Sequence, residues 1–281
     1  MEVVKQISEL KRLLKPLRGR SRSVSLVPTM GALHQGHIHL VRQARAESEF
    51  VVVSIFVNPT QFNNPSDLAQ YPRTLSADLS LLEAEGVDVV FVPETGEMYP
   101  SEVNVTFHFP GLDEVLEGAF RPGHFNGVAI VVSKLFHIIQ PDIAYFGQKD
   151  LQQVSIIRRL VRDLHFDLHI QVVPTVREED GLALSSRNLR LTPTQRQQAL
   201  SLYQCLESAK TELSGGNPWF DTKTRLEGEF CRSKDVQLEY LALVDLEDFR
   251  LSEVRKPEIK QSICIAAYVG DVRLIDNIIL D

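Results

Sequence analysis

The sequence predicts an α/β protein in which a doubly wound parallel sheet is followed by a smaller α+β domain. Over the first ~175 residues, short apolar runs alternate with longer amphipathic stretches, as strands and helices alternate in such a sheet. The short runs are β-branched and apolar almost throughout, which is typical of strands covered on both faces. Beyond Pro174, charged turns and polar stretches replace this alternation, so a second domain begins there.

The N-terminal segment predicts an amphipathic helix, because apolar side chains recur at helical spacing between charged ones. These apolar residues are Val4, Ile7, Leu10, Leu14 and Leu17. The segment has no apolar core of the kind found in secretion signals, so we expect no secretion signal.

Short apolar runs bounded by turn residues predict the strands of the first domain. They are residues 24–27, closed by Pro28, residues 50–57, closed by Asn58-Pro59, and residues 87–92, 143–146 and 168–173. The longer stretches between them predict helices at residues 38–46, 74–85, 128–139 and 151–164. The third of these helices stops before Gln140-Pro141, because the residue before a proline disfavours helical geometry.

We place the domain boundary near residue 176, which divides the chain into residues 1–176 and 177–281. In the second part, Thr192-Pro193 marks a helix start, and the stretch 207–223 is polar and contains Gly215-Gly216. Strand-like runs at residues 240–244 and 262–268 complete the expectation of a small α+β domain.

Composition narrows the class of protein. The formal net charge of −7 argues against a nucleic-acid partner, which would require a concentrated basic surface. No stretch approaches 18 uninterrupted apolar residues, so no membrane partner is expected. Three widely spaced cysteines, Cys205, Cys231 and Cys264, form no CxxC pair and predict free buried thiols in a cytoplasmic protein.

The strongest candidate site is the segment 28–37, Pro-Thr-Met-Gly-Ala-Leu-His-Gln-Gly-His, between a predicted strand and a predicted helix. Gly31 and Gly36 let the backbone approach a ligand, and the helix N-terminus offers N–H groups to phosphate. His34 and His37 can donate hydrogen bonds to a phosphate whose charge grows in a transition state. The alternative is that both histidines only cap the helix. His39 has no Cys or carboxylate partner at ligand spacing, which argues against zinc.

A second polar segment, residues 58–63, follows the second predicted strand at its carboxyl end. Asn58 and Gln61 can present neutral amides to the hydroxyl and carboxylate groups of a small polar substrate. A plain Asn-Pro turn without a ligand is the alternative.

The third segment, residues 146–150, follows another strand and opens a helix. Lys149 can neutralise phosphate charge, whereas Asp150 is suited either to capping the helix or to accepting a hydrogen bond from ribose or substrate. Gln153, in the first turn of that helix, is placed to share a pocket with Gln61.

The fourth segment, residues 182–188, follows an Asp-Gly turn at the start of the second domain. Two hydroxyls and a guanidinium, from Ser185, Ser186 and Arg187, suit a mobile loop that clamps phosphate. An ordinary surface loop is the alternative.

Together and in this order, these segments resemble the motifs of the pantothenate synthetase family, which belongs to the adenylyl-transferring superfamily with an HxGH motif. The matching motifs span nearly the whole chain. They are PTMGALHxGH from Pro28, VNPTQF from Val57, YPRT from Tyr71, RPGHFNGV from Arg121, FGxKDLQQ from Phe146, ALSSRN from Ala183 and RLIDN from Arg273.

The resemblance implies a Rossmann-like N-terminal domain that binds ATP and pantoate, a C-terminal lid domain and a homodimer. It also implies an Mg²⁺-dependent ligation of pantoate to β-alanine through pantoyl adenylate. The residues implied to bind ATP are Met30, Gly31, Ala32, Leu33, His34, Gln35, Gly36, His37, Gly147, Gln148, Lys149, Asp150, Val176, Leu184, Ser185, Ser186 and Arg187.

The resemblance also implies individual roles. His37 would be the catalytic proton donor that assists the departure of pyrophosphate, with His34 and Lys149 sharing the phosphate charge. Gln61 and Gln153 would hold pantoate, and Gln61 would also contact β-alanine. Asp78 is the candidate for contact with the Mg²⁺ that enters with ATP, so it is the one expected metal contact.

Two positions depart from many family members, which have Glu where Gln148 stands and a smaller residue where Phe120 stands. Neither is a proposed catalytic group, but the first leaves the electrostatics around Lys149 open. Two other functions remain as alternatives: a nucleotidyltransferase that stops after transferring AMP, and a catalytically silent nucleotide-binding regulator. Against the regulator stands the complete set of His34, His37, Lys149, Ser185 and Arg187.

Overall fold

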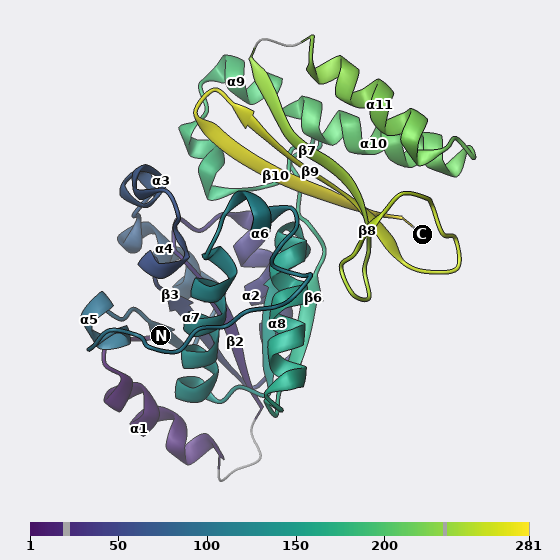
Figure 1. The fold of residues 1–281 in the computed structure, drawn as a ribbon. Helices are drawn as coiled ribbons and strands as arrows, with labels where there is room; N and C mark the ends of the chain where they lie inside the picture. Colours follow the sequence, from purple (N-terminus) through teal and green to yellow (C-terminus); the bar gives the residue numbers. More distant parts are fainter. Residues whose placement is uncertain (19–22, 233–234, 281) are drawn as a thin grey trace. The chain divides into compact units, whose positions relative to one another are not determined.

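The computed structural model describes residues 1–18, 23–232 and 235–280. The chain forms two compact units. One contains Met1–Gln148 and Ile156–Pro174, and the other contains Lys149–Ser155 and Thr175–Asp281. Each unit is built around a sheet of its own (Figure 1). Within the described ranges, no helix is both long enough and apolar enough to cross a membrane.

The first unit is built on a six-stranded sheet in the order β1-β4-β3-β2-β5-β6, and every paired neighbour runs parallel. The expected doubly wound parallel sheet is therefore confirmed. Strand order reverses between β2 and β5, and the carboxyl ends of strands at such a reversal are where these sheets bind ligands. The strands are β1 (Glu2–Val4), β2 (Val24–Thr29), β3 (Phe50–Ile55), β4 (Val89–Phe91), β5 (Ile143–Gly147) and β6 (His169–Val173).

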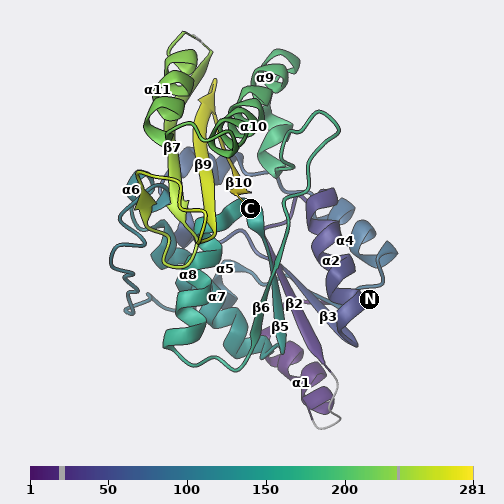
Figure 2. The same cartoon turned by 90° about the vertical axis from the view of Figure 1, so that its right-hand side faces the viewer.

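Helices cover both faces of this sheet, with α2 and α4 on one face and α7 on the other (Figure 2). Leu40, Val41 and Ala44 of α2 are buried against strand residues such as Val27 and Val53. The helices up to the second unit are α1 (Ile7–Arg18), α2 (Gln35–Glu47), α3 (Pro65–Gln70), α4 (Leu75–Ala84), α5 (Thr95–Met98), α6 (Glu117–Phe120), α7 (His124–Ile139) and α8 (Leu151–Asp163), with short 3₁₀ turns η1 (Pro59–Gln61) and η2 (Gln148–Asp150).

Two local expectations for the first unit were wrong. Val4 does not belong to the N-terminal helix, because it pairs with Phe91 as the last residue of strand β1. Pro28 does not close β2 but lies inside it, opposite Ser54. A three-residue strand is too short to show its own periodicity, and only pairing with β4 reveals it.

The second unit is an α+β structure with an antiparallel sheet in the order β10-β9-β7-β8. Leu206 and Ala209 of α10 and Leu226 of α11 share a core with Ile263 and Ile265 of β9. The elements are η3 (Ser186–Arg190), α9 (Pro193–Gln198), α10 (Leu200–Ser214), α11 (Trp219–Phe230), β7 (Val236–Asp245), β8 (Leu251–Ser252), β9 (Gln261–Val269) and β10 (Val272–Leu280).

Sequence reasoning located α9 but missed parts of this unit. The Thr192 hydroxyl accepts a hydrogen bond from the Gln195 N–H in a capping box, as the Thr-Pro start indicates. The polar stretch 207–223 contains the end of α10 and the start of α11, whose outward faces supply its polar residues. Strand β10 was not expected. Of the three free cysteines, Cys205 and Cys264 are buried as expected, whereas Cys231 is exposed.

Candidate active site

The turn between β2 and α2 is held from the strand side by Thr29. Its hydroxyl donates to the Ser54 carbonyl at 2.8 Å and accepts the Gly31 N–H at 3.2 Å. Gly31 and Ala32 then adopt left-handed conformations, with φ of 79° and 49°. Glycine tolerates this geometry, but an alanine does so only when its surroundings hold it there. The turn leads directly to His34, the N-cap of α2.

His34 and His37 form a reciprocal cap at the start of α2. The Gly36 N–H donates to His34 Nδ1 at 3.1 Å, and the His34 N–H donates to His37 Nδ1 at 3.3 Å. The two ring centroids are 4.1 Å apart. The capping alternative from the sequence is therefore real, and it is not a rival to a catalytic role, since each ring uses only one nitrogen in the cap.

The cap also selects the tautomer of both rings. A nitrogen that accepts a backbone N–H carries no proton, so a neutral His34 or His37 bears its proton on Nε2. Each neutral ring thus has an N–H donor on the side opposite its capping nitrogen. Paired donors of this kind can stabilise negative charge that develops on a phosphate.

Several backbone N–H groups expected to meet phosphate already have partners within this unit. The Ala32 N–H donates to Asp78 Oδ2 at 2.9 Å, the Leu33 N–H donates to Asp78 Oδ1 at 2.8 Å, and the Gly36 N–H is used in the cap. In this turn the imidazoles, rather than these three amides, are the groups suited to bind an anion.

Asp78, the residue expected to contact Mg²⁺, has several partners within the protein. It lies on α4 with 2% of its surface exposed, and both carboxylate oxygens accept backbone N–H groups from the turn. Oδ1 also accepts the Thr74 hydroxyl at 3.0 Å. Both carboxylate oxygens of Asp78 thus point at protein donors.

Asn58 and Gln61 are brought together at the carboxyl end of β3. Asn58 is 1% exposed, and its Nδ2 donates to Gln61 Oε1 and to the Gly127 carbonyl, both at 3.2 Å. Its Oδ1 accepts the Tyr99 hydroxyl at 2.7 Å. Burial raises the pKa of Tyr99, which keeps this hydroxyl protonated as a donor. Asn58 therefore orients the Gln61 amide, so the segment is more than an Asn-Pro turn.

The Gln61 amide points toward the first turn. Gln61 Oε1 accepts a hydrogen bond from Asn58, and its Nε2 donates to Met30 Sδ at 2.9 Å. A thioether is a weak acceptor, so a substrate oxygen would replace it as the better partner. This geometry joins the first and second sequence segments at adjoining strand ends.

Residues of the Arg121 motif support the same loop, although sequence reasoning gave them no role. His124 Nδ1 lies 2.7 Å from the Gln61 carbonyl and its Nε2 lies 3.2 Å from Arg121 Nη1. Since a carbonyl only accepts and a guanidinium only donates, these contacts place the His124 proton on Nδ1. Gly127 lies so close to Thr60 that a Cβ would be 2.2 Å from the Thr60 carbonyl oxygen. The quoted motif was the available signal for both residues.

Lys149 and the Ser185–Arg187 segment lie in the second unit. The Asn277 side chain donates to the Lys149 carbonyl at 2.9 Å and so ties η2 to β10. Asp150 is exposed and Gln153 is half-buried. Gly147 and Gln148 end the preceding stretch of the first unit, at the end of β5 and the start of η2.

Val176 and Leu184 are brought together by a backbone hydrogen bond of 3.0 Å, in a short hairpin bridged at Arg177 and Ala183. Arg177 donates to both carboxylate oxygens of Asp276, at 2.5 and 3.0 Å, and lies over the Tyr203 ring. Sequence reasoning missed Arg177 and Asp276, and the RLIDN motif was the only signal for the latter.

The candidate phosphate clamp begins where this hairpin ends. The Ser185 hydroxyl caps η3 by accepting the Arg187 N–H at 3.3 Å. Ser186 is 6% exposed. The loop is therefore held by the hairpin that precedes it and by the 3₁₀ turn that it contains.

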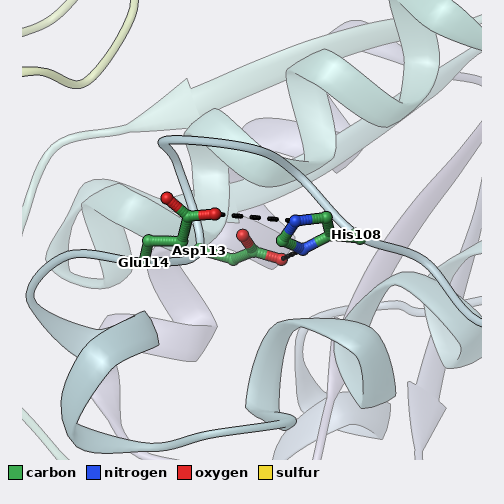
Figure 3. A group of neighbouring side chains, drawn as sticks. All are labelled: His108, Asp113 and Glu114. Carbon is green, nitrogen blue, oxygen red and sulfur yellow. Dashed lines mark hydrogen bonds and ion pairs between the residues drawn. The ribbon is translucent and has the colours of Figure 1, made fainter.

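Among the described residues, one group of side chains, His108, Asp113 and Glu114, meets the spacing of metal ligands. The Asp113 and Glu114 carboxylates lie on the same side of the His108 ring (Figure 3). Its Nδ1 lies 3.1 Å from Asp113 Oδ2, and its Nε2 lies 3.6 Å from Glu114 Oε1. Each ring nitrogen thus faces a different carboxylate.

Comparisons with known proteins identify the family of this chain. The family model described as pantoate-beta-alanine ligase matches residues 2–279. A pantothenate synthetase of Koribacter versatilis (strain Ellin345) is 48% identical, with 100% of this chain and 96% of that protein covered. One of Thermotoga neapolitana is 47% identical, with 100% of both chains covered.

Solved structures give the same result. The pantothenate synthetase of Thermus thermophilus superposes with a TM-score of 0.92 at 42% identity, over 99% of both chains. A pantoate-beta-alanine ligase of Francisella tularensis, complexed with beta-gamma ATP and beta-alanine, gives 0.84 at 36% identity, over 99% of this chain and 97% of that one. The chain belongs to the pantoate-beta-alanine ligase family.

Proposed function

We propose that this enzyme uses ATP to join pantoate to β-alanine through an enzyme-bound pantoyl adenylate. Its family membership supports ATP-dependent pantoate–β-alanine ligation. The observation that carries the mechanism is the paired cap of His34 and His37, which puts the proton of each neutral ring on Nε2 at the N-terminus of α2.

In the first step a pantoate carboxylate oxygen attacks the α-phosphorus of ATP. A bond forms between that oxygen and phosphorus, and the bond from phosphorus to the bridging oxygen of pyrophosphate breaks. Charge grows on the phosphate oxygens during this exchange, so positioned donors accelerate it more than a covalent nucleophile would. His37 serves the departing pyrophosphate, and His34 and Lys149 share the remaining phosphate charge.

In the second step the β-alanine amine attacks the acyl carbon of the adenylate. A C–N bond forms, the C–O bond to AMP breaks, and the amine loses a proton. AMP is a good leaving group, which is the chemical reason for forming the adenylate first. Water would hydrolyse the same intermediate, so the site must exclude it.

The proposed binding groups follow the resemblance, with one exception. ATP is assigned to residues 30–37, 147–150, 176 and 184–187, and pantoate to Gln61 and Gln153, with Gln61 also contacting β-alanine. The fixed Gln61 amide supports this assignment, since its Nε2 donates to a thioether, a weak acceptor that a substrate oxygen would replace. Mg²⁺ enters with ATP as part of the substrate, and Asp78 is not assigned to it because both its oxygens hold the turn.

The remaining proposals concern the whole chain. Residues 1–176 would carry the ATP and pantoate sites, and residues 177–281 would act as a lid over the nucleotide. We further propose a cytoplasmic homodimer. The three free cysteines are compatible with a reducing compartment.

The test is exchange of labelled pyrophosphate into ATP. Exchange should require pantoate but not β-alanine, and addition of β-alanine should then release AMP and form pantothenate. A nucleotidyltransferase would not respond to β-alanine, and a silent binding protein would show no exchange. If pyrophosphate exchange occurs only when β-alanine is present, the reaction is concerted and no free adenylate forms.

A further inference from the structure

We propose that Asp78 is a positioning residue of the ATP site, which holds the Gly31–Leu33 turn so that His34 and His37 face the nucleotide. The inference rests on the proposed function of the two histidines. It assigns Asp78 to the shape of the turn instead of to a metal ion.

The contacts converge on one carboxylate from three directions. Asp78 Oδ2 accepts the Ala32 N–H at 2.9 Å, and Oδ1 accepts the Leu33 N–H at 2.8 Å and the Thr74 hydroxyl at 3.0 Å. With 2% of the residue exposed, little water competes for these oxygens. Hydrogen bonds to a charged, buried acceptor are among the stronger ones in proteins.

The turn has the shape of an anion nest, and Asp78 is the anion within it. Two successive N–H groups, of Ala32 and Leu33, converge on one carboxylate in a turn where Gly31 and Ala32 have positive φ, 79° and 49°. Such a nest often binds phosphate. Here a carboxylate from α4 occupies it, so the two amides define the path of the chain into His34 rather than contacting ATP.

The packing around Gly31 supports the same role. A Cβ on Gly31 would lie 3.1 Å from Asp78 Oδ2 and 3.1 Å from Ile55 Cγ2. The turn is therefore enclosed between α4 and the end of β3. Leu33, the second residue held, immediately precedes His34, whose N–H in turn orients His37.

The contact also gives a physical role to the Tyr71–Thr74 motif. Thr74 stands one residue before α4, and its hydroxyl supplies the third donor to Asp78. Thr74 and Asp78 are four residues apart, which brings their side chains together at the start of the helix. Thr74 of this motif thus orients the Asp78 carboxylate, which in turn holds the turn before His34.

The central variant is Asp78→Asn, in which the new NH₂ group would face one of the two backbone donors. Pantoate-dependent pyrophosphate exchange should lose on the order of 10- to 100-fold in kcat/KM for ATP. The KM for pantoate should stay unchanged, because Gln61 is held by Asn58 instead. Amide hydrogen exchange of residues 31–34 should speed up, while that of residues 24–29 should not.

The matched control is Asp142→Asn. Asp142 Oδ2 accepts the Val24 N–H at 2.6 Å, at the opposite end of the same strand β2. This variant should lower Tm. It should leave kcat/KM for ATP and the amide hydrogen exchange of residues 31–34 unchanged. Thr74→Val keeps both backbone contacts of Asp78, so it should fold even if Asp78→Asn does not. Its kcat/KM for ATP should fall about 2- to 10-fold.

Three results would overturn the proposal. One is unchanged kcat/KM for ATP in Asp78→Asn, and another is a loss no greater than that of Asp142→Asn at a matched fall in Tm. The third is full rescue of Asp78→Asn by raised Mg²⁺, which would restore the metal contact. If the wild-type enzyme itself shows no pantoate-dependent exchange, the proposed function fails, whereas the hydrogen-exchange result still decides the role of Asp78.

Discussion

At the scale of single residues, the site depends on which nitrogen of each imidazole carries the proton. Nδ1 of His34 and of His37 is used by a backbone N–H, so capping of α2 and donation by Nε2 are two properties of one arrangement. A residue at either position must therefore both accept at one atom and donate at another. Among uncharged side chains, glutamine offers the same pair of functions on a more flexible chain.

His37→Ala should slow adenylate formation by ~10²–10³ while changing ATP affinity little, because its hydrogen bond strengthens as charge moves to pyrophosphate. His37→Gln should recover part of the lost rate. Single-turnover formation of the adenylate is the measurement. His39→Ala, an exposed position on the same helix, is the control and should keep the wild-type rate. Equal losses in the His37 and His39 variants would remove His37 from the mechanism.

At the scale of elements, the site is built where helices and loops approach closely. Helix α7 contacts η1 through Gly127, because only a residue without Cβ lets the Thr60 carbonyl come so near. Asn58 then bonds to the Gly127 carbonyl and to Gln61 at once. The position of the Gln61 amide is thus a consequence of how α7 packs.

Gly127→Ala should therefore disturb both stability and pantoate binding. Its Cβ would lie 2.2 Å from the Thr60 carbonyl oxygen and 2.7 Å from the Gln61 nitrogen, so η1 must shift. We expect a loss of ~1–3 kcal/mol in the free energy of unfolding and a raised KM for pantoate. Gly228→Ala on α11, where nothing lies within 4 Å, should be neutral or stabilising. If Gly127→Ala is destabilised but keeps the wild-type KM for pantoate, then the packing of α7 does not determine the pantoate site.

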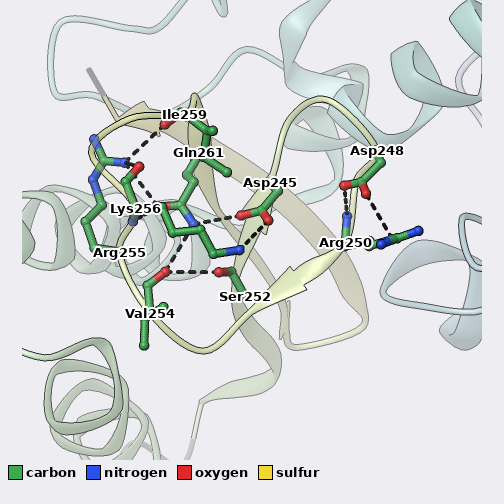
Figure 4. A network of polar contacts seen from close by, with 9 residues as sticks. All are labelled: Asp245, Asp248, Arg250, Ser252, Val254, Arg255, Lys256, Ile259 and Gln261. Atoms are coloured by element: carbon green, nitrogen blue, oxygen red, sulfur yellow. Dashed lines mark hydrogen bonds and ion pairs between the residues drawn. The ribbon is translucent and has the colours of Figure 1, made fainter.

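The loops at one end of the second sheet are closed by a buried glutamine. Gln261, at the start of β9, donates to Asp245 Oδ1 at 2.7 Å and to the Val254 carbonyl at 3.1 Å, and accepts the Lys256 N–H at 2.7 Å (Figure 4). The pKa of the Asp245 carboxyl lies below its usual value, because hydrogen bonds from Lys256 and Gln261 outweigh the opposing effect of burial.

Gln261→Leu should cost ~1–3 kcal/mol of unfolding free energy, since it leaves the Lys256 N–H and one Asp245 oxygen without this partner in a buried place. Gln237→Leu, at an exposed position of β7, is the control and should change stability little. Urea denaturation of the two variants provides the comparison. Similar midpoints for Gln261→Leu and the wild type would show that the loops re-form their hydrogen bonds.

At the scale of the whole molecule, the two glutamines proposed to bind pantoate belong to different compact units. Gln61 is part of the first unit and Gln153 of the second. Two neutral amides suit a carboxylate that must act as a nucleophile, because an Arg or Lys ion pair would hold it more strongly and lower its reactivity.

Gln61→Ala and Gln153→Ala should each weaken pantoate binding by ~1–3 kcal/mol, and the double variant should lose less than the sum if both touch one ligand. Pantoate affinity measured by calorimetry checks this, with ATP affinity as the control. Additive losses would place the two residues at independent positions. A fall in ATP affinity alone would move both glutamines to the nucleotide site.

Local sequence pattern predicts five of the six strands of the parallel sheet in the first unit. Its strands are short β-branched runs, and its helices carry their own amphipathic spacing, so local pattern was sufficient. The same holds for His34 and His37, which lie three apart and cap one helix through hydrogen bonds within a single turn. Strand β1 was not predicted, because it has only three residues. The helices within the polar stretch 207–223 were not predicted either, because most of their solvent-facing side chains are polar.

The long-range contacts that hold the proposed catalytic side chains follow from the tertiary fold. Asp78 meets Leu33 across 45 positions of sequence, and Asn277 meets Lys149 across 128. Asn58 meets Gly127 across 69. No local periodicity encodes such pairs, since a carboxylate or amide looks alike whether it meets solvent, a metal or a backbone N–H. Packing of α4 against the turn buries the Asp78 carboxylate against backbone donors that only a folded chain brings together.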